Sequence, residues 1–210
     1  MKIDKITCCS IILAMGFLLG YADVLAGPPQ YPHNRWMLGV DLVGNDLGEA
    51  DDLDNLYIDS HGTGGAFQAG FLLSPRFQLR LYTSGAEHQT SLQGAQLYAT
   101  GASLEVAYLF RPFTSFRPYV NGGLGGFRLE SRQTNLEYRT DGGGFIFGGG
   151  AHWYLGKVVA IHFSARLEAV NWDSQRASLI LPSGESVVFE APFDESGGMG
   201  KLTLGLSFWI

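Results

Sequence analysis

The sequence predicts an all-β protein, an eight-stranded antiparallel transmembrane up-and-down β-barrel. Three observations predict this fold. Eight segments alternate large apolar residues with small or polar ones at a period of two, which is the pattern of a β-strand. Short and long connections alternate between these segments. The face opposite the apolar residues consists of small and charged residues, which is typical of a barrel wall that crosses a membrane.

The composition excludes several other classes of protein. Glycine contributes 29 of the 210 residues, and charged residues make up 16% of the chain, against an average of about 25%. A chain with so little charge and 13% aromatic residues is not disordered. The formal net charge of −6 argues against a nucleic-acid partner, which would require a basic surface.

Residues 1–26 have the pattern of a secretory signal peptide. Lys2 and Lys5 precede an apolar stretch at 10–20, which is too short for a membrane span of about 20 residues. Small or modest residues at 24–26 suit a cleavage site, although a retained anchor is the alternative. Both cysteines lie inside this segment, so the predicted barrel domain, residues 27–210, contains no disulfide, thiolate metal site or cysteine nucleophile.

The first four alternating segments each place large apolar residues at every second position. Their apolar faces comprise Trp36, Leu38, Val40 and Leu42; Phe67, Ala69, Phe71 and Leu73; Phe77, Leu79 and Leu81; and Tyr98, Ala102, Leu104, Val106, Tyr108 and Phe110. The intervening positions are small or polar and include Asp41, Arg80 and Glu105. Each segment therefore predicts a strand with one apolar face.

The last four segments follow the same rule. Their apolar faces comprise Tyr119, Phe127 and Leu129; Phe145, Phe147 and Trp153; Val159, Ile161, Phe163, Ala165 and Leu167; and Leu202, Leu204, Leu206, Phe208 and Ile210. In the fifth segment we expect Gly122, Gly126, Arg128 and Glu130 on the opposite face. The seventh segment is the clearest, since His162, Ser164, Arg166 and Glu168 alternate with its apolar residues.

The connections come in two lengths. Short turns are expected at 74–76, near Pro112 and at 155–157, and longer polar links at 44–63, 86–95, 131–141 and 173–199. With strands of about ten residues, such alternation is typical of a transmembrane barrel with short turns on one side of the membrane. No helix is expected beyond residue 26.

The face opposite the apolar one is expected to fill a narrow lumen. Its predicted charged network consists of four acids and four bases: Asp41, Glu105, Glu130, Glu168, Arg80, Arg128, Arg166 and Lys201. Neighbouring strands would pair Arg80 with Glu105 and Glu168 with Lys201. Because the lumen of an eight-stranded barrel is filled by side chains, a general porin is not expected.

Aromatic residues gather near the strand ends on the short-turn side. They are Trp36, Phe110, Phe113, Phe116, Tyr119, Trp153, Tyr154 and Phe208. Such a cluster is typical of the aromatic girdle at a membrane interface. The alternative is the ordinary enrichment of aromatic residues in strands.

The end of the chain resembles the C-terminal signal read by the outer-membrane assembly machinery, with Thr203, Gly205, Phe208 and Ile210 at the matching positions. Ile210 departs from the usual final Phe. Residues 117–125 and the sixth and seventh segments resemble strands of OmpA/OmpX-type barrels. The resemblance implies an integral, monomeric protein of the Gram-negative outer membrane, in contact with lipids, lipopolysaccharide and the assembly machinery. It implies no cofactor and no enzyme activity.

His162 and Ser164 lie on one face of a predicted strand, which resembles the His-x-Ser element of lipid A deacylases. A histidine beside a serine can activate the hydroxyl group for nucleophilic attack. Two features disagree with that family: Ala165 replaces its Asn, and no carboxylate follows at its spacing. The strand pattern also turns both side chains toward the lumen. A packed lumen is therefore favoured over a catalytic pair.

The first long link is acidic. Asp51, Asp52 and Asp54 lie within it, and clustered carboxylates can bind Ca²⁺ or Mg²⁺. Because the spacing is not that of a known cation loop, a solvated surface loop is favoured over a metal site.

Residues 178–190 have the pattern of a hairpin inside the last long link. The hairpin either extends the barrel wall or pairs through its edge with a partner. The predicted role is therefore structural or surface-interactive, through the long extracellular links. A lipid A hydrolase and a narrow conduit for small solutes are the alternatives.

Overall fold

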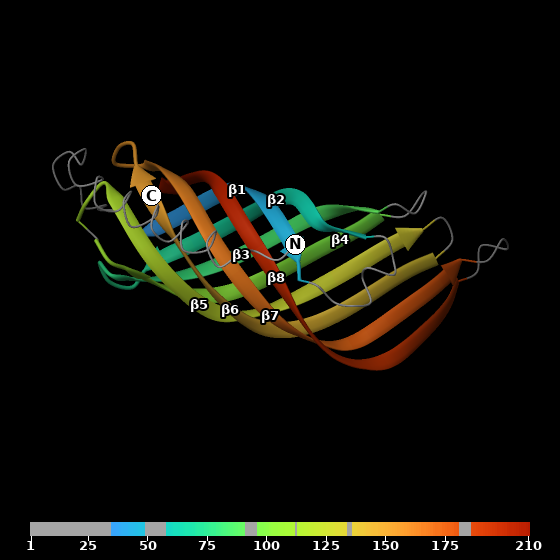
Figure 1. The fold of residues 1–210 in the computed structure, drawn as a ribbon. Helices are drawn as coiled ribbons and strands as arrows, with labels where there is room; N and C mark the ends of the chain where they lie inside the picture. The colour runs from blue at the N-terminus through green and yellow to red at the C-terminus, as the bar shows by residue number, and fades with distance from the viewer. Residues whose placement is uncertain (1–34, 49–57, 91–95, 112, 134–135, 181–185) are drawn as a thin grey trace, which may run out of the picture.

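The computed structural model describes residues 35–48, 58–90, 96–111, 113–133, 136–180 and 186–210. They form a closed barrel in which every strand pairs with its neighbours in the sequence and β1 also pairs with β8, all antiparallel (Figure 1). The strands are β1 (Trp36–Leu47), β2 (Ile58–Leu72), β3 (Phe77–Thr90), β4 (Gln96–Leu109), β5 (Phe116–Gln133), β6 (Leu136–Tyr154), β7 (Val159–Ile180) and β8 (Ser186–Trp209). The predicted fold class is confirmed.

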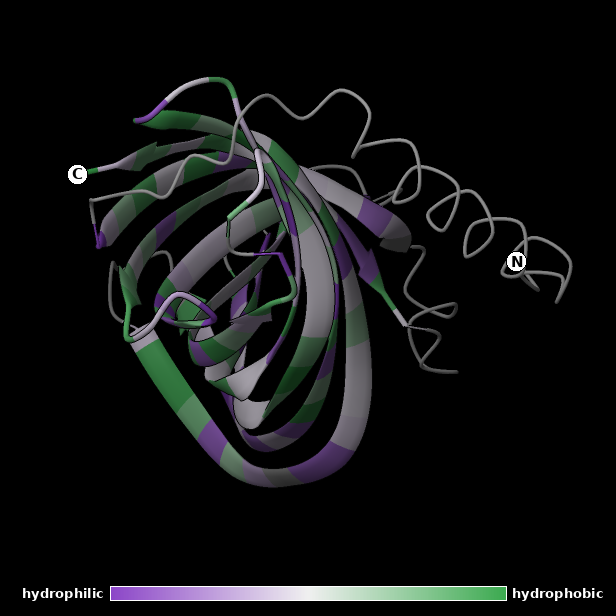
Figure 2. Cartoon of the chain, turned by 90° about the vertical axis from the view of Figure 1, so that its left-hand side faces the viewer, coloured by the Kyte–Doolittle hydropathy of each residue, from purple (hydrophilic) through white to green (hydrophobic). Residues whose placement is uncertain are grey.

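The short turns and both chain ends of the described barrel lie at one rim. There the backbone N–H of Trp36 donates to the carbonyl oxygen of Ile210 (3.0 Å), and Leu72 N–H donates to the carbonyl oxygen of Arg35 (2.8 Å). Viewed from this rim, the strands form a closed ring (Figure 2). Within the described residues, no helix has the length and apolar character needed to cross a membrane.

The strands are longer than predicted. β5 to β8 have 18, 19, 22 and 24 residues, whereas β1 to β4 have 12 to 15. The expected long links at 131–141 and 173–199 are therefore mostly strand. Apolar alternation stops where both faces of a strand meet water, but the backbone hydrogen bonds continue, so the sequence pattern ends before the strand does.

The ends of β5 to β8 that lie furthest from the short turns thus form a sheet, which extends beyond β1 to β4 on one side of the barrel (Figure 1). Register shifts lie where the wall passes into this extension: β6 residues Asp141 and Gly142 pair with Ser174 and Trp172 of β7, so the extra residue is Asp173 of β7, and the pairing of β7 with β8 shifts at the same place. A bulge bends its strand and increases the local twist. We call these ends, residues 128–133, 136–141, 174–180 and 186–197, the extracellular sheet, because the long ends of a transmembrane barrel are expected on the outer side of the membrane.

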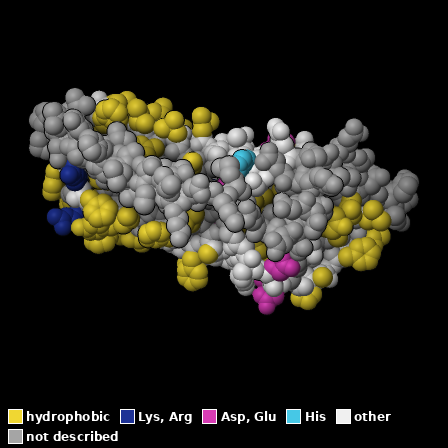
Figure 3. Space-filling model, in the orientation of Figure 1, with side chains coloured by type: hydrophobic (Ala, Val, Ile, Leu, Met, Phe, Trp, Pro, Cys, Tyr) yellow, Lys and Arg dark blue, Asp and Glu magenta, His cyan; other side chains and the backbone are white. Residues whose placement is uncertain are grey.

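The outer surface carries an apolar band. Leu42, Leu124, Phe145, Leu167 and Leu202 are among the large apolar side chains that are more than half exposed on it. On the face drawn in Figure 3, many apolar side chains gather toward the end with the short turns. So large an apolar surface is unfavourable in contact with water and is stabilised when lipid covers it. The predicted lipid-facing surface is therefore present.

β5 is the one strand whose faces were assigned incorrectly. Tyr119 and Phe127 are 2% and 4% exposed and point into the barrel, whereas Arg128 and Glu130 are partly exposed on the outside. This strand has large apolar residues at both odd and even positions, so its period does not decide its orientation. Pairing decides it, because Tyr119 lies opposite Leu109 and Gly150, which face inward.

The aromatic residues at the short-turn rim divide between the two faces. Trp36, Phe110, Phe113, Trp153 and Phe208 are each about half exposed on the outside, as an interfacial girdle requires. Tyr119 and Tyr154 are buried in the lumen instead. There they join a cluster with Met37, Leu109 and Trp209 that closes this end of the barrel.

Candidate functional site

The lumen is packed in three layers. The layer at the short-turn rim is the cluster that contains Trp209 and Tyr154. A second apolar layer lies toward the other end and includes Leu47, Phe127, Ile146 and Trp172. Between these two layers lies a charged layer, described below, whose side chains come from all eight strands.

Glu105 on β4 is the centre of the charged layer. Its carboxylate accepts hydrogen bonds from Arg80 (2.9 Å), Asn121 (2.8 Å) and Ser103 (2.7 Å), and it also pairs with Arg166. Glu105 is 1% exposed. A buried carboxylate is tolerated only with such a complete set of donors, because an unpaired buried charge is costly.

A second ion pair links β7 to β8. Lys201 Nζ lies 2.8 Å from a carboxylate oxygen of Glu168 and donates to Ser84 Oγ on β3 (3.0 Å). Arg166 lies 3.5 Å from the same carboxylate group and stacks over the Tyr82 ring at 3.9 Å. Arg166 therefore joins the two carboxylates, Glu105 and Glu168, into one network.

A third group surrounds His162 on β7. Its Nδ1 lies 3.1 Å from Asp41 Oδ1, and its Nε2 lies 2.5 Å from the Tyr119 hydroxyl group. Gln68 donates to the other oxygen of Asp41 (2.9 Å), and His152 stacks on His162 at 4.8 Å. The Gln68 amide nitrogen lies 3.1 Å from the same Nδ1, so both ring nitrogens have polar partners.

This carboxylate–imidazole–hydroxyl series has the order of a hydrolase triad, but no substrate can reach it. Asp41, His162 and Tyr119 are 5%, 1% and 2% exposed. The predicted partner of His162, Ser164, instead bonds Thr203 Oγ1 at 2.7 Å. The structure therefore does not bring His162 and Ser164 together as a catalytic pair.

Six of the eight residues predicted for the lumen network point inward, while Arg128 and Glu130 do not. Tyr119, Asn121 and Arg117 are lumen residues that the sequence pattern did not assign to the lumen. A Cβ at Gly150 would conflict first with the Phe163 carbonyl oxygen and also with the Tyr119 hydroxyl oxygen at 2.8 Å, so glycine is needed where β6, β7 and this side chain approach one another.

Arg128 and Glu130 belong instead to a charged group on the outside of the extracellular sheet. Arg128 and Arg139 both pair with Asp141 at 2.7 Å, and Arg132 pairs with Glu130 at 2.5 Å. Further along the sheet, Arg176 pairs with Glu190. All of these side chains are partly or largely exposed, and they lie beyond the apolar band.

The hairpin predicted at 178–190 extends the barrel wall. β7 and β8 pair continuously from Val159↔Phe208 to Ile180↔Ser186, with one bulge. Val187, Val188 and Phe189 near its end are 39%, 50% and 62% exposed. Figure 3 shows apolar side chains at this end, separated from the apolar band by acidic ones.

The four residues of the predicted assembly signal lie in the C-terminal part of β8 and directly after it. Phe208 and Ile210 point outward and are 43% and 60% exposed, while Thr203 points into the lumen. Gly205 lies opposite Asp41 on β1. Asp51, Asp52 and Asp54, the candidate cation ligands, lie outside the described residues. The residues that are described contain no cluster of three potential metal ligands.

Comparisons with known proteins agree with this architecture. No family model and no curated protein match the chain. The crystal structure of neisserial surface protein A (NspA) matches with a TM-score of 0.58 at 12% identity, over 83% of this chain and 97% of that one. A major outer membrane protein from Thermus thermophilus matches at 0.57 and 14%, over 83% and 99%. Ail, the attachment invasion locus protein of Yersinia pestis, matches at 0.56 and 10%, over 84% and 99%.

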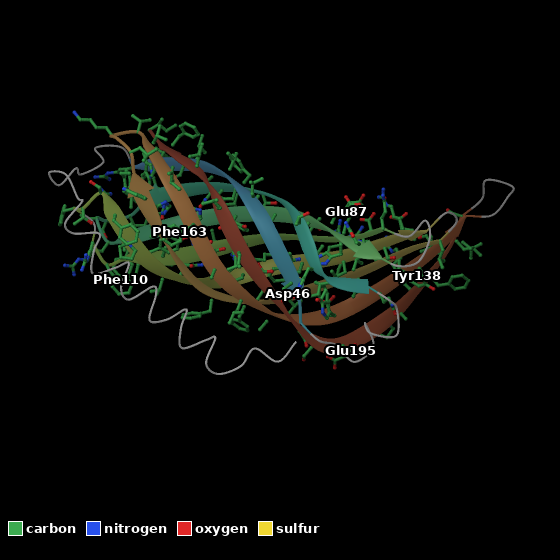
Figure 4. The ribbon with its side chains drawn as sticks, turned by 45° about the horizontal axis from the view of Figure 1, so that its top comes forward. Asp46, Glu87, Phe110, Tyr138, Phe163 and Glu195 are labelled. Carbon is green, nitrogen blue, oxygen red and sulfur yellow. The ribbon has the colours of Figure 1, made fainter. Side chains whose placement is uncertain are left out.

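The chain has the fold of the small eight-stranded outer-membrane β-barrels. Together with the apolar band on its surface, this fold places the protein in the Gram-negative outer membrane. In such a barrel the short turns face the periplasm and the long ends face outward. The extracellular sheet of this outer-membrane barrel therefore stands above the outer leaflet. Asp46, Glu87, Tyr138 and Glu195 lie toward that end, and Phe110 and Phe163 lie toward the periplasmic one (Figure 4).

Proposed function

We propose that this outer-membrane barrel binds a protein partner at the cell surface through its extracellular sheet, and that it is not an enzyme or a general porin. The observation that carries the proposal is the exposed edge of β8. β1 pairs with β8 only as far as Leu47↔Met199, whereas β8 continues to Ser186. Among the described strands, residues 186–197 of β8 thus pair with β7 alone.

A strand edge of this kind offers backbone N–H and C=O groups to another extended chain. Val187, Val188 and Phe189 supply exposed apolar surface on both faces of the edge. Glu190, Asp194 and Glu195 follow, and no basic residue lies on this part of β8. The edge therefore suits an extended segment that carries apolar and basic side chains.

The lumen favours this proposal over the two alternatives. A conduit requires an open path, whereas the charged layer lies between two apolar layers of buried side chains. A lipid A hydrolase requires a nucleophile that faces lipid, whereas His162 is 1% exposed and Ser164 pairs with Thr203. The names of two proteins of the same fold, a surface protein and an attachment protein, are consistent with a role at the surface.

The proposal is tested with the full barrel in lipid nanodiscs and a phage-displayed library of random peptides. We expect enrichment of apolar and basic peptides over empty nanodiscs, and slower amide hydrogen exchange in residues 186–197 when an enriched peptide is bound. The matched variant replaces residues 177–189 with Asn-Gly, which connects the cross-strand pair Arg176 and Glu190 through a tight turn. Failure to enrich any peptide, or equal binding by the shortened variant, would refute the proposal.

A further inference from the structure

The outer surface carries a group of arginines directly above the apolar band, on one side of the barrel only. Arg128 on β5, Arg139 on β6 and Arg176 on β7 lie on the outside of the extracellular sheet. On the corresponding outer face of β1 to β4, the described residues above the band include Asp46 and Glu87 but no lysine or arginine. The positive charge is therefore gathered on β5 to β7.

The height of this group on the barrel is fixed by its neighbours. Leu124 on β5 and Phe145 on β6 are 60% and 72% exposed and belong to the apolar band. Arg128 and Asp141 each lie four residues further along these strands, which is about 13 Å of strand. The exposed positions in between are Gly126 and Gly143, so the arginines lie just beyond the last large apolar side chains of these strands, where lipid head groups follow the hydrocarbon region.

Asp141 holds two of the arginines side by side. Its Oδ1 accepts from Arg128 Nε (2.7 Å), and its Oδ2 accepts from Arg139 Nε (2.7 Å). Arg139 Nη2 also contacts Oδ1, at 3.3 Å. The pair is bound mainly through the Nε atoms, and within the described residues the two terminal nitrogens of Arg128 have no protein partner. Two positive charges thus share one carboxylate.

Two hollows flank Asp141 on the outer surface. One, of about 470 Å³, is lined by Arg139, Arg176, Ser174 and Gln175, with the acids Asp141 and Glu190. The other, of about 370 Å³, is lined by Arg128, Asp141, Thr83 and Thr100 over a floor of small residues that includes Gly126. Arginine and hydroxyl groups therefore line both hollows, together with Asp141.

The second hollow exists because outward positions lack side chains. A Cβ at Gly126 would meet only one neighbouring atom, the carbonyl oxygen of Gly142 at 4.0 Å. A Cβ at Gly143 would lie 3.8 Å from the oxygen of Gly125. Larger side chains fit at these positions without steric conflict, so the packing of the barrel does not require glycine at either one.

We propose that the hollows on both sides of Asp141 bind the phosphate-bearing head group of lipopolysaccharide, with Arg128, Arg139 and Arg176 as the phosphate ligands. A guanidinium group matches phosphate geometry through paired hydrogen bonds. The hydroxyl and amide groups of Thr83, Thr100, Ser174 and Gln175 suit the sugar to which the phosphate is attached. Asp141 acts as a positioning residue that fixes the two neighbouring guanidinium groups.

The test uses the full barrel in neutral phosphatidylcholine nanodiscs, with purified lipopolysaccharide as the probe and native mass spectrometry as the measurement. We expect the unaltered barrel to bind one lipopolysaccharide molecule. The double variant Arg128→Gln/Arg139→Gln is expected to bind lipopolysaccharide more weakly, by at least about tenfold in the dissociation constant for each arginine removed. Gly126→Leu fills a hollow and keeps every charge, so it is also expected to weaken binding. Arg132→Gln is the matched control, since Arg132 lies on the same face but lines neither hollow.

Two further probes identify the source of the phosphate. Lipopolysaccharide from which the phosphates have been removed is expected to bind at the level of the double variant. Phosphatidylglycerol added to the nanodiscs is expected to compete poorly, since it lacks the phosphorylated sugar. The proposal would be overturned if the dephosphorylated probe bound as tightly as intact lipopolysaccharide, or if phosphatidylglycerol competed as well as lipopolysaccharide does. It would also be overturned if Gly126→Leu and the double variant both bound lipopolysaccharide as tightly as the unaltered barrel. Heat-modifiable gel mobility verifies that every variant is folded.

Discussion

Gly205 shows how one position can serve assembly and packing together. It matches the glycine of the C-terminal assembly signal, and it lies where β8 approaches β1. A Cβ at this position would overlap both the Val40 carbonyl oxygen and Asp41 Oδ1. Neither atom can move freely, because one belongs to the backbone and the other is bound to His162. The glycine is therefore required by the closed barrel itself.

We expect Gly205→Ala to destabilise the barrel by about 1–3 kcal/mol, the usual cost of overpacking a well-filled interior. The measurement is the folded fraction after refolding into detergent micelles, where no assembly machinery is present. Gly65→Ala on β2 is the control, since its Cβ would lie 3.7 Å from the nearest atom, the carbonyl oxygen of Asp41. Equal refolding of the two variants would mean that Gly205 matters only for recognition by the machinery.

Single residues could be assigned to a face of the barrel where the period of two was unambiguous. Asp41, Arg80, Glu105 and Lys201 each lie between outward apolar residues, and each points into the lumen. Tyr119 was assigned to the wrong face because β5 carries large apolar residues at both parities. The partners of His162 could not be predicted, since Asp41 and Tyr119 come from distant strands and meet it across the lumen.

At the scale of the strands, the sequence predicted the membrane-spanning part of each element but not its upper end. The membrane imposes alternation only where one face meets lipid. Above the band, residues such as Glu137, Arg139, Ser174 and Arg176 continue the ladder without an apolar face. The extracellular sheet therefore has the backbone hydrogen bonds of strands but the polar composition of a loop. For this reason the lengths of β7 and β8 could not be predicted from the alternation of apolar residues.

The end of the extracellular sheet should be separable from the barrel. Val187, Val188 and Phe189 are exposed, and the described residues at 177–189 contribute nothing to either apolar layer of the lumen. Replacing residues 177–189 with Asn-Gly is expected to change the free energy of unfolding by less than about 1 kcal/mol, within the usual range for exposed positions. Urea unfolding in micelles measures this, and a larger loss would show that the end supports the barrel.

The molecule as a whole is a barrel with a filled interior. Charged side chains from opposite walls meet at Glu105, and an apolar layer lies on each side of them. The network crosses the barrel, since Arg80, Glu105 and Arg166 belong to β3, β4 and β7. Stability and impermeability therefore depend on the same contacts.

Glu105→Gln should weaken both properties, because Arg80 and Arg166 would lose their shared carboxylate. We expect a loss of about 3–5 kcal/mol in the free energy of unfolding, the cost of leaving a buried charge without its partner. We also expect conductance events in planar bilayers, which the unaltered barrel should not show. Glu87→Gln, which changes an outward-facing carboxyl group, serves as the control. An unchanged unfolding curve for Glu105→Gln would show that the network adds little to stability.

The position of Phe189 has a consequence for how the protein can change over time. Antibodies reach a bacterial surface from outside, and the described end of β7 and β8 lies at the opposite side of the barrel from the short turns (Figure 1). The exposed residues there do not pack against the lumen, so their substitution costs the barrel little stability. Immune selection can therefore alter this end without destabilising the barrel, within the limits that the proposed partner sets, while Glu105, His162 and their partners keep the barrel closed.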